Sequence, residues 1–82
     1  MGRNELIREI NVLALNGEFD EATFFFDDQE FTVTVCGFEC GSTMVDVSYF
    51  PDFDGYVDIE MFNDEFLCAL YRAISVTDKN LF

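Results

Sequence analysis

The chain has 82 residues, half of them hydrophobic, which is enough for one domain with a single core. Seventeen acidic residues against four basic ones give a net charge of −13 at pH 7. A field of this sign repels nucleic acid and anionic membrane surfaces and attracts basic surfaces, so direct binding to DNA or RNA is the least favoured class of function.

A helix is predicted over Asn4–Asn16. Leu6, Ile10 and Leu13 recur at spacings of three and four residues, which is the pattern of a helix with one apolar face. Asn4 is expected to cap the first turn, and Gly17 suits a left-handed stop at the other end. This helix should therefore bury one side against the core.

Two strands are predicted next, over Ala22–Phe26 and Phe31–Phe38, joined by a turn at Asp27–Glu30. Pairing the last residue of the first strand with the first residue of the second keeps the apolar side chains on one face. The other face carries threonines and one aromatic residue, Phe25. Such an aromatic is either covered by a terminus or available to a partner.

A looser turn is expected over Gly37–Thr43, and the stretch Met44–Phe62 then alternates between apolar and polar residues on both sides of a second turn. This alternation predicts an antiparallel hairpin with its loop at Pro51–Gly55. If Tyr49 pairs with Val57, all the apolar side chains of the hairpin share one face. The four strands together form an antiparallel meander.

This register sets Asp46 directly across from Glu60, and Ser48 across from Asp58. Like charges that face each other across a strand pair are destabilising by a few tenths to about 1 kcal/mol. The pairing alone leaves two interpretations open, a function for these acids and a plain solvated face with no partner, and the net charge of the whole chain favours the function.

The last helix is predicted over about Asn63–Ile74, with Asn63 as its cap and two acids complementing its N-terminal dipole. Ser75–Phe82 is expected to be a frayed tail. Residues 1–82 are thus predicted to form one α+β domain, a four-stranded antiparallel sheet with the N-terminal and C-terminal helices packed on one face, in the order α-β-β-β-β-α. The second face of the sheet must meet water, another copy or another protein.

Templates for metal and catalytic sites fail. The stretch Asp52–Gly55 suits part of a calcium loop, but the two ends of that template fall on Phe50 and Met61, which are not carboxylates. Without histidine, a zinc site lacks a fourth strong ligand and a nucleophile lacks its base. Asp58 and Glu60 lack the dry pocket that separates the pKa values of an acid–base pair. We therefore expect no metal, no cofactor and no enzymatic activity.

Features of the sequence also predict where the protein resides. It contains no apolar run of about 18 residues, so no transmembrane helix is predicted, and charges interrupt the N-terminal stretch where a signal peptide would need an apolar core. We expect a cytoplasmic protein in which three thiols are reduced and buried. These are Cys36, Cys40 and Cys68.

What remains is negative charge repeated on rigid strands, where residues two apart are separated by about 6.7 Å. Such an array suits the arginine and lysine surface with which a nucleic-acid-binding protein contacts phosphates. We therefore expect a monomeric nucleic-acid mimic that inhibits a basic protein and binds neither nucleic acid nor membranes. The expected interface residues are Asp46, Asp58 and Glu60 on the sheet, Asp52 and Asp54 in the turn, Asp27, Asp28, Glu30 and Glu39 at the other turns, and Phe25, Phe53 and Tyr56 as aromatic anchors.

The segment Asn4–Ile10, NELIREI, resembles the opening helix of small acidic phage anti-CRISPR proteins that inhibit type II-A Cas9. The resemblance covers seven residues of 82 and carries no functional residue over. It implies a helix-plus-sheet fold, mimicry of the DNA around the protospacer-adjacent motif, and a CRISPR effector as target. A restriction enzyme is the second choice. The alternatives are an immunity protein against a basic nuclease toxin, and an assembly protein whose open sheet face joins another copy.

Overall fold

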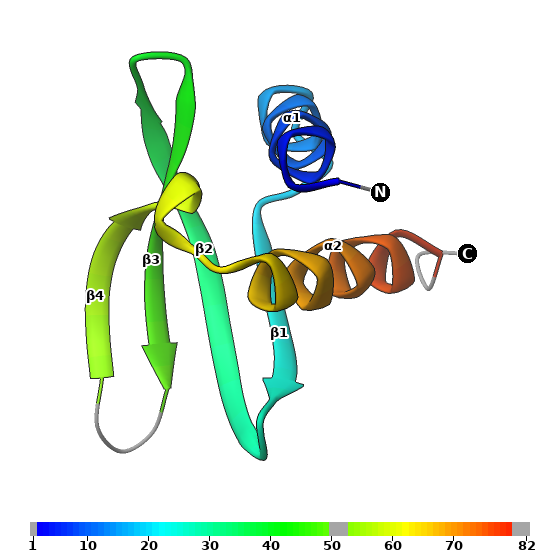
Figure 1. Ribbon diagram of the computed structural model, residues 1–82, viewed down its shortest axis with the longest axis vertical. Coiled ribbons are helices and arrows are strands. Elements are labelled where there is room, and N and C mark those ends of the chain that lie inside the picture. Colours follow the sequence, from blue (N-terminus) through cyan, green and yellow to red (C-terminus); the bar gives the residue numbers. More distant parts are fainter. Residues whose placement is uncertain (1, 50–52, 80–82) are drawn as a thin grey trace.

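The computed structural model describes residues 2–49 and 53–79. It has two layers, one of helices and one formed by a single β-sheet. The elements are α1 (Arg3–Leu15), β1 (Glu21–Phe26), β2 (Gln29–Glu39), β3 (Ser42–Tyr49), β4 (Phe53–Asp58), the short 3-10 helix η1 (Ile59–Met61) and α2 (Asp64–Lys79). The strands are all antiparallel to their neighbours and lie in the order β1-β2-β3-β4 (Figure 1). The predicted α+β meander with two terminal helices is confirmed.

The core lies between the helices and one face of the sheet. Alternate strand residues such as Val33, Val45 and Val47 are buried on this face because successive side chains of a strand point to opposite sides. They meet Leu67 and Leu70 of α2, which are fully buried. The rest of this one contiguous cluster comes from the helices, the connection after α1, and β1, and comprises Leu6, Ile10, Ala14, Phe19, Ala22, Ile59, Phe66 and Ile74.

The register of the first hairpin differs from the predicted pairing of Phe26 with Phe31. Phe26 pairs with Gln29, and Phe24 pairs with Phe31. The turn contains only Asp27 and Asp28, both with positive φ (55° and 65°). Two-residue turns of this kind match the right-handed twist of the strands. The slip is two residues, so every side chain stays on its predicted face.

A second two-residue turn replaces the looser turn predicted over Gly37–Thr43. Cys40 and Gly41 both have positive φ, and β2 continues to Glu39 instead of ending at Phe38. A shift in register between Val35 and Gly37 inserts one extra residue, which is a β-bulge. The predicted pairs of Val33 with Val47 and Val35 with Val45 are confirmed, because they precede the bulge.

The second hairpin departs furthest from the prediction. Tyr49 pairs with Phe53, and Val57 pairs with Val45, so the strands are displaced by four residues from the predicted register. The stretch after Asp58 is not strand but η1. The Asp58 side chain accepts a hydrogen bond from the Glu60 backbone N–H at 2.9 Å and caps this turn.

The displaced register removes the predicted repulsion between facing acids. Asp46 lies across from Tyr56, not Glu60, and Ser48 lies across from Asp54, not Asp58. The predicted loop over Pro51–Gly55 is also wrong at its end, because β4 begins at Phe53. The prediction that Asp46 faces Glu60 at a cost in stability is therefore wrong.

Both helices begin within one residue of the predicted positions, but α2 ends later than predicted. The cap of α1 is Gly2, whose carbonyl accepts from the Leu6 N–H at 2.9 Å, and not Asn4. Asn63 caps α2 as predicted, with its Oδ1 accepting from the Phe66 N–H at 2.8 Å. Helix α2 continues to Lys79, so the predicted tail begins later than Ser75, and residues 80–82 lie outside the described residues.

Arg3 joins the start of α1 to the segment between η1 and α2. Its guanidinium donates to the carbonyl oxygens of Phe62 and Glu60 and forms an ion pair with Asp64 at 2.9 Å. These contacts span about 60 residues of sequence, so they fix the relative positions of the two helices over the sheet.

Candidate protein-binding surface

The sheet face turned away from the helices is the candidate site, and we call it the open face. Strand register places its residues in cross-strand rows, because each pairs with a residue that points the same way. The open face consists of Glu21, Thr23 and Phe25 of β1, Glu30, Thr32 and Thr34 of β2, Asp46 and Ser48 of β3, and Tyr56 of β4.

Acids and hydroxyls alternate on this face. One row runs from Glu21 through Thr34 and Asp46 to Tyr56. Glu21 and Asp46 are thus two strands apart, about 9.6 Å at the usual strand spacing. A hydroxyl-bearing residue between two carboxylates reduces their mutual repulsion while leaving a negative surface.

The neighbouring row is polar and uncharged across β1, β2 and β3, and its position on β4 is Asp54. It pairs Thr23 with Thr32 and Thr32 with Ser48. The Thr23 and Thr32 hydroxyls lie 3.2 Å apart and share a hydrogen bond. These short side chains add hydrogen-bond donors and acceptors between the acids, and they protrude little from the middle of the face.

Two aromatic side chains stand at opposite edges of the open face. Phe25 on β1 is 72% exposed and Tyr56 on β4 is 55% exposed. Phe25 lies across from Glu30, and Tyr56 lies across from Asp46. Two of the three predicted aromatic anchors, Phe25 and Tyr56, are therefore exposed and lie across from an acidic residue, an arrangement that suits an interface with arginine or lysine.

The surroundings of Tyr56 alter the pKa of its phenol. Desolvation by neighbouring atoms, followed by the negative charges of Glu39 and Cys36, raises the pKa of the Tyr56 phenol above its ordinary value of 10.0. The phenol is therefore neutral at physiological pH and presents an O–H group to a partner. Because its pKa is raised further from neutrality, the Tyr56 phenol is not suited to general acid–base catalysis near pH 7.

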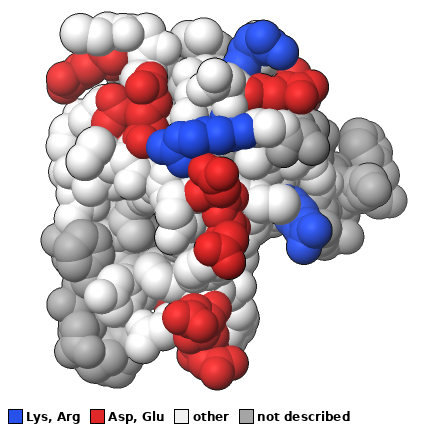
Figure 2. Space-filling model, in the orientation of Figure 1, with Lys and Arg blue, Asp and Glu red and all other residues white. Residues whose placement is uncertain are grey.

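All four basic residues lie on the helices. Arg3 and Arg8 are in α1, and Arg72 and Lys79 are in α2. No strand contains Lys or Arg, whereas every strand contains at least one acid. Figure 2, which looks onto the side bearing the helices, likewise shows the basic side chains over the helical part. The acids of the sheet thus lie on strands, whereas the bases lie on the two helices.

Several predicted interface residues are engaged locally or lie off this face. Asp58 pairs with Met44, on the side of the sheet that carries Asp46 and Tyr56, but its carboxylate accepts from the Ser42 hydroxyl as well as capping η1. Glu60 is in η1, not on the sheet. Asp27 and Asp28 form the exposed β1–β2 turn, so they border the open face at one end only.

Three further predicted residues fall at the margin of what the structure describes. Asp52 lies outside the described residues. Phe53 and Asp54 are positions of β4 that pair with Tyr49 and Ser48, but their side chains lie outside the described part. Glu39 is exposed at the end of β2, beside Tyr56, as the effect of its charge on the Tyr56 pKa indicates.

Glu21 is an interface candidate that sequence reasoning missed. The residue was assigned to the connection before the first strand, whereas it is the first residue of β1 and is exposed. Extending the alternation of Thr23 and Phe25 back by one step would have placed it on the open face.

Other chemistry is poorly supported among the described residues. Two of the three thiols, Cys36 and Cys40, are exposed, so the prediction that all are buried is wrong; Cys68 is half-buried, and none forms a disulfide. The described part of the chain contains no group of three or more side chains suited to a metal ion. Its helices are also too short or too polar to cross a membrane.

Comparison with known proteins adds no family assignment. No protein-family model matches the chain, and neither the curated proteins nor the solved structures provide a match.

Proposed function

We propose that this protein is an acidic inhibitor whose open face occupies the nucleic-acid-binding groove of a basic protein. The favoured target is a CRISPR effector, whose binding to target DNA or cleavage of it would be blocked. The observation that carries the proposal is the distribution of charge: acids, hydroxyls and two exposed aromatics lie on the open face, and all four bases lie on the helices.

The open face offers the chemical groups that a phosphate-binding groove recognises. Arginine contacts carboxylate and phosphate oxygens with the same bidentate geometry. Carboxylates on strands are held at fixed spacing, so they require little ordering when they bind. Phe25 and Tyr56 supply apolar contact at the two edges, where a purely charged face would gain little net affinity after desolvation.

Two other targets use the same physics. A restriction enzyme presents a comparable basic groove, and so does a basic nuclease toxin neutralised by an immunity protein. Self-association through the open face is less favoured, because it would bring two surfaces of net negative charge together.

The direct test is displacement of labelled target DNA from a type II-A Cas9–guide RNA complex by the intact protein. The wild-type protein is expected to displace DNA, with an affinity that falls steeply between about 0.1 and about 0.5 M salt, because screening shortens the reach of the charges. The variant Glu21→Lys/Glu30→Lys is expected to weaken displacement by about tenfold or more.

The matched control is Glu5→Lys/Glu18→Lys, which changes the net charge equally at exposed positions off the open face. It is expected to retain most of the activity. Equal losses in both variants would indicate a bulk charge effect and contradict docking by the open face. Displacement that does not respond to salt would contradict the mimic itself.

A further inference from the structure

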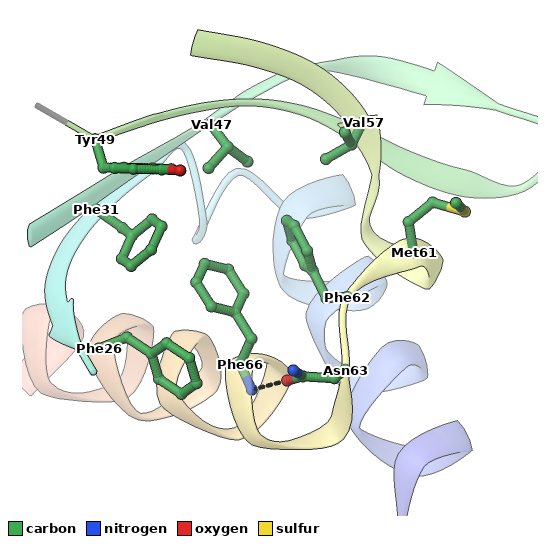
Figure 3. Close-up of a pocket in the computed structure, with 9 residues that line it drawn as sticks. All are labelled: Phe26, Phe31, Val47, Tyr49, Val57, Met61, Phe62, Asn63 and Phe66. Atoms are coloured by element: carbon green, nitrogen blue, oxygen red, sulfur yellow. Dashed lines mark hydrogen bonds between the residues drawn. The ribbon is translucent and has the colours of Figure 1, made fainter. Parts of the chain in front are cut away.

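A pocket of about 350 Å³ lies on the opposite side of the sheet from the open face. Its walls are formed by residues of all four strands, by the segment that joins η1 to α2, and by the first turn of α2 (Figure 3). Val47 and Phe66 form its buried floor, and Met61, which is 78% exposed, stands at its mouth. The lining is almost entirely apolar.

Aromatic packing makes the wall of this pocket rigid. The Phe66 ring lies 5.0 Å from Phe31 and 4.6 Å from Phe62, measured between ring centroids. Phe31 lies 4.9 Å from Tyr49 on the next strand. Figure 3 shows these rings arranged around the pocket, with Val47 and Val57 across from them. Contacts of this geometry favour a fixed arrangement, so the pocket is preformed.

The helices leave this part of the sheet uncovered. Helix α2 packs against β1 and α1, and α1 reaches β3 near Thr43, whose hydroxyl and N–H both donate to Asn11 Oδ1. In Figure 1 both helices lie toward β1, and β4 extends away from them. The predicted packing of both helices on this face is therefore confirmed, but the helices leave open the part of the sheet that lines the pocket.

Acids surround the mouth of the apolar pocket. Glu60 precedes Met61, Asp64 and Glu65 follow Asn63, and the exposed Asp27–Asp28 turn follows Phe26. Figure 2 shows acidic side chains in a column from the start of α2 to the β1–β2 turn. The nearby base, Arg3, is engaged by Asp64 and two carbonyl groups. The rim is therefore net negative around an apolar floor.

We infer that this pocket binds a basic polypeptide segment of a partner protein by receiving one apolar side chain that is flanked by lysine or arginine. The volume is at the small end of ligand pockets, which suits one or two side chains better than a cofactor. The apolar floor accounts for the anchor, and the acidic rim accounts for the flanking positive charge. A nucleotide or an anionic lipid would meet the repulsion of the same rim.

A second copy of the chain is a poorer occupant. Each copy carries a charge of −13, and the rim acids would face one another across the contact. The inference does not rest on the proposed function, because the pocket and the open face are on opposite sides of the sheet.

The test uses a nine-residue peptide with one central phenylalanine, flanked by lysines and glycines, titrated into the intact protein. Two matched peptides replace the phenylalanine with alanine or the lysines with glutamate. The phenylalanine–lysine peptide is expected to bind at least about tenfold more tightly than the alanine peptide, because a buried aromatic ring contributes that much or more. It should also shift the methyl NMR signals of Val47, Val57 and Met61.

Met61→Lys places a positive charge at the mouth, and Leu15→Lys makes the same change in charge at an exposed position of α1. Met61→Lys is expected to weaken binding of the peptide about tenfold or more, and Leu15→Lys only slightly. Because both side chains are largely exposed, both variants should fold, which their melting curves would verify.

Three outcomes would overturn the inference. The alanine and phenylalanine peptides could bind equally, or both lysine variants could lose affinity equally, and in either case only general charge attraction is at work. Alternatively, the free protein could form a stable dimer that Met61→Lys dissociates, and the occupant would then be a second copy. Loss of DNA displacement in the open-face variant with unchanged binding of the peptide would leave this inference intact and the two surfaces distinct.

Discussion

The two faces of the sheet are built from alternate residues of the same strands, yet their environments are opposite. On one face Val33 and Val45 are fully buried. On the other, Thr34 and Asp46, their immediate neighbours in sequence, form part of a polar row that no helix covers. A shift of one residue along a strand therefore decides whether a side chain stabilises the fold or faces solvent and potential partners.

The helical layer and the sheet also differ in the charges that they carry. The helices carry the only bases, and Arg3 uses its charge to hold α1 against the start of α2. The strands carry acids and no bases, so the open face presents negative charge to which a basic partner is attracted. The buried face supplies stability, and the open face can then vary in composition at little cost.

Truncation on the two faces is expected to give the largest contrast. Val33→Ala should lower the free energy of unfolding by about 2 kcal/mol, because it removes two buried methyl-sized groups and leaves a cavity. Thr34→Ala, one residue away on the open face, should change it by about 0.5 kcal/mol or less. Denaturant unfolding would measure both, and equal losses would contradict the assignment of the faces.

The contribution that the hydrogen bonds of Arg3 make to stability can be separated from the effect of its positive charge. Arg3→Gln is expected to lower the free energy of unfolding by about 1 kcal/mol, because part-exposed charge-assisted hydrogen bonds to two carbonyl groups and Asp64 are lost. Arg8→Gln removes the same charge from an exposed position of the same helix. Thermal melting of the pair should show the larger loss for Arg3→Gln.

Neutralising an acid is expected to change the stability of the protein in opposite directions on the sheet and on α1. Glu21→Gln should stabilise the protein by a few tenths of a kcal/mol, since it relieves repulsion with Asp46 about 9.6 Å away. Glu5→Gln should destabilise it by a similar amount, because Glu5 lies in the first turn of α1 and interacts favourably with the helix dipole. Both effects should shrink as salt is added, whereas wild-type melting temperature should rise. Salt-independent differences would rule out this electrostatic origin.

The smallest effect concerns the edge of the open face at high pH. The folded-state pKa of Tyr56 is above 10.0 because of desolvation and the charges of Glu39 and Cys36. The stability associated with the neutral phenol is therefore fully present below about pH 10 and is lost as the pH rises through the folded-state pKa. Glu39→Gln should lower the pKa of Tyr56 in an ultraviolet titration, and Glu5→Gln should not. Tyr56→Phe should remove this titration and reduce the loss of stability above pH 10.

Local pattern was sufficient to identify elements but not their pairing. The two-residue alternation correctly assigned Val45, Val47 and Val57 to one face, since a side chain keeps its face when a strand slips by two or four residues. For the same reason alternation could not choose between registers. In both adjacent hairpins the chain took a shorter turn than the one predicted, at Asp27–Asp28 and at Cys40–Gly41, with positive φ at both central residues.

The sequence predicted which kinds of residue the candidate site contains better than it predicted which individual residues belong to it. Phe25 and Tyr56 were expected to be exposed and are. Glu60 left the sheet because Ile59, one residue earlier, is fully buried in the core and turns the chain into η1. Burying this large apolar side chain was worth more than continuing an edge strand, a balance that depends on the helices packed above it.

The amino-acid sequence by itself determined the class of the fold, the order of its elements, the side of the sheet on which each strand residue lies, and the excess of negative charge. These follow from periodicity and composition, which act over a few residues. Tertiary structure alone decided the registers of β1 with β2 and of β3 with β4, the end of β4 at Asp58 and the uncovered pocket beside Phe66. Those features depend on how strand twist, turn geometry and the volume of the helices fit together, and that fit is a property of contacts between distant parts of the chain.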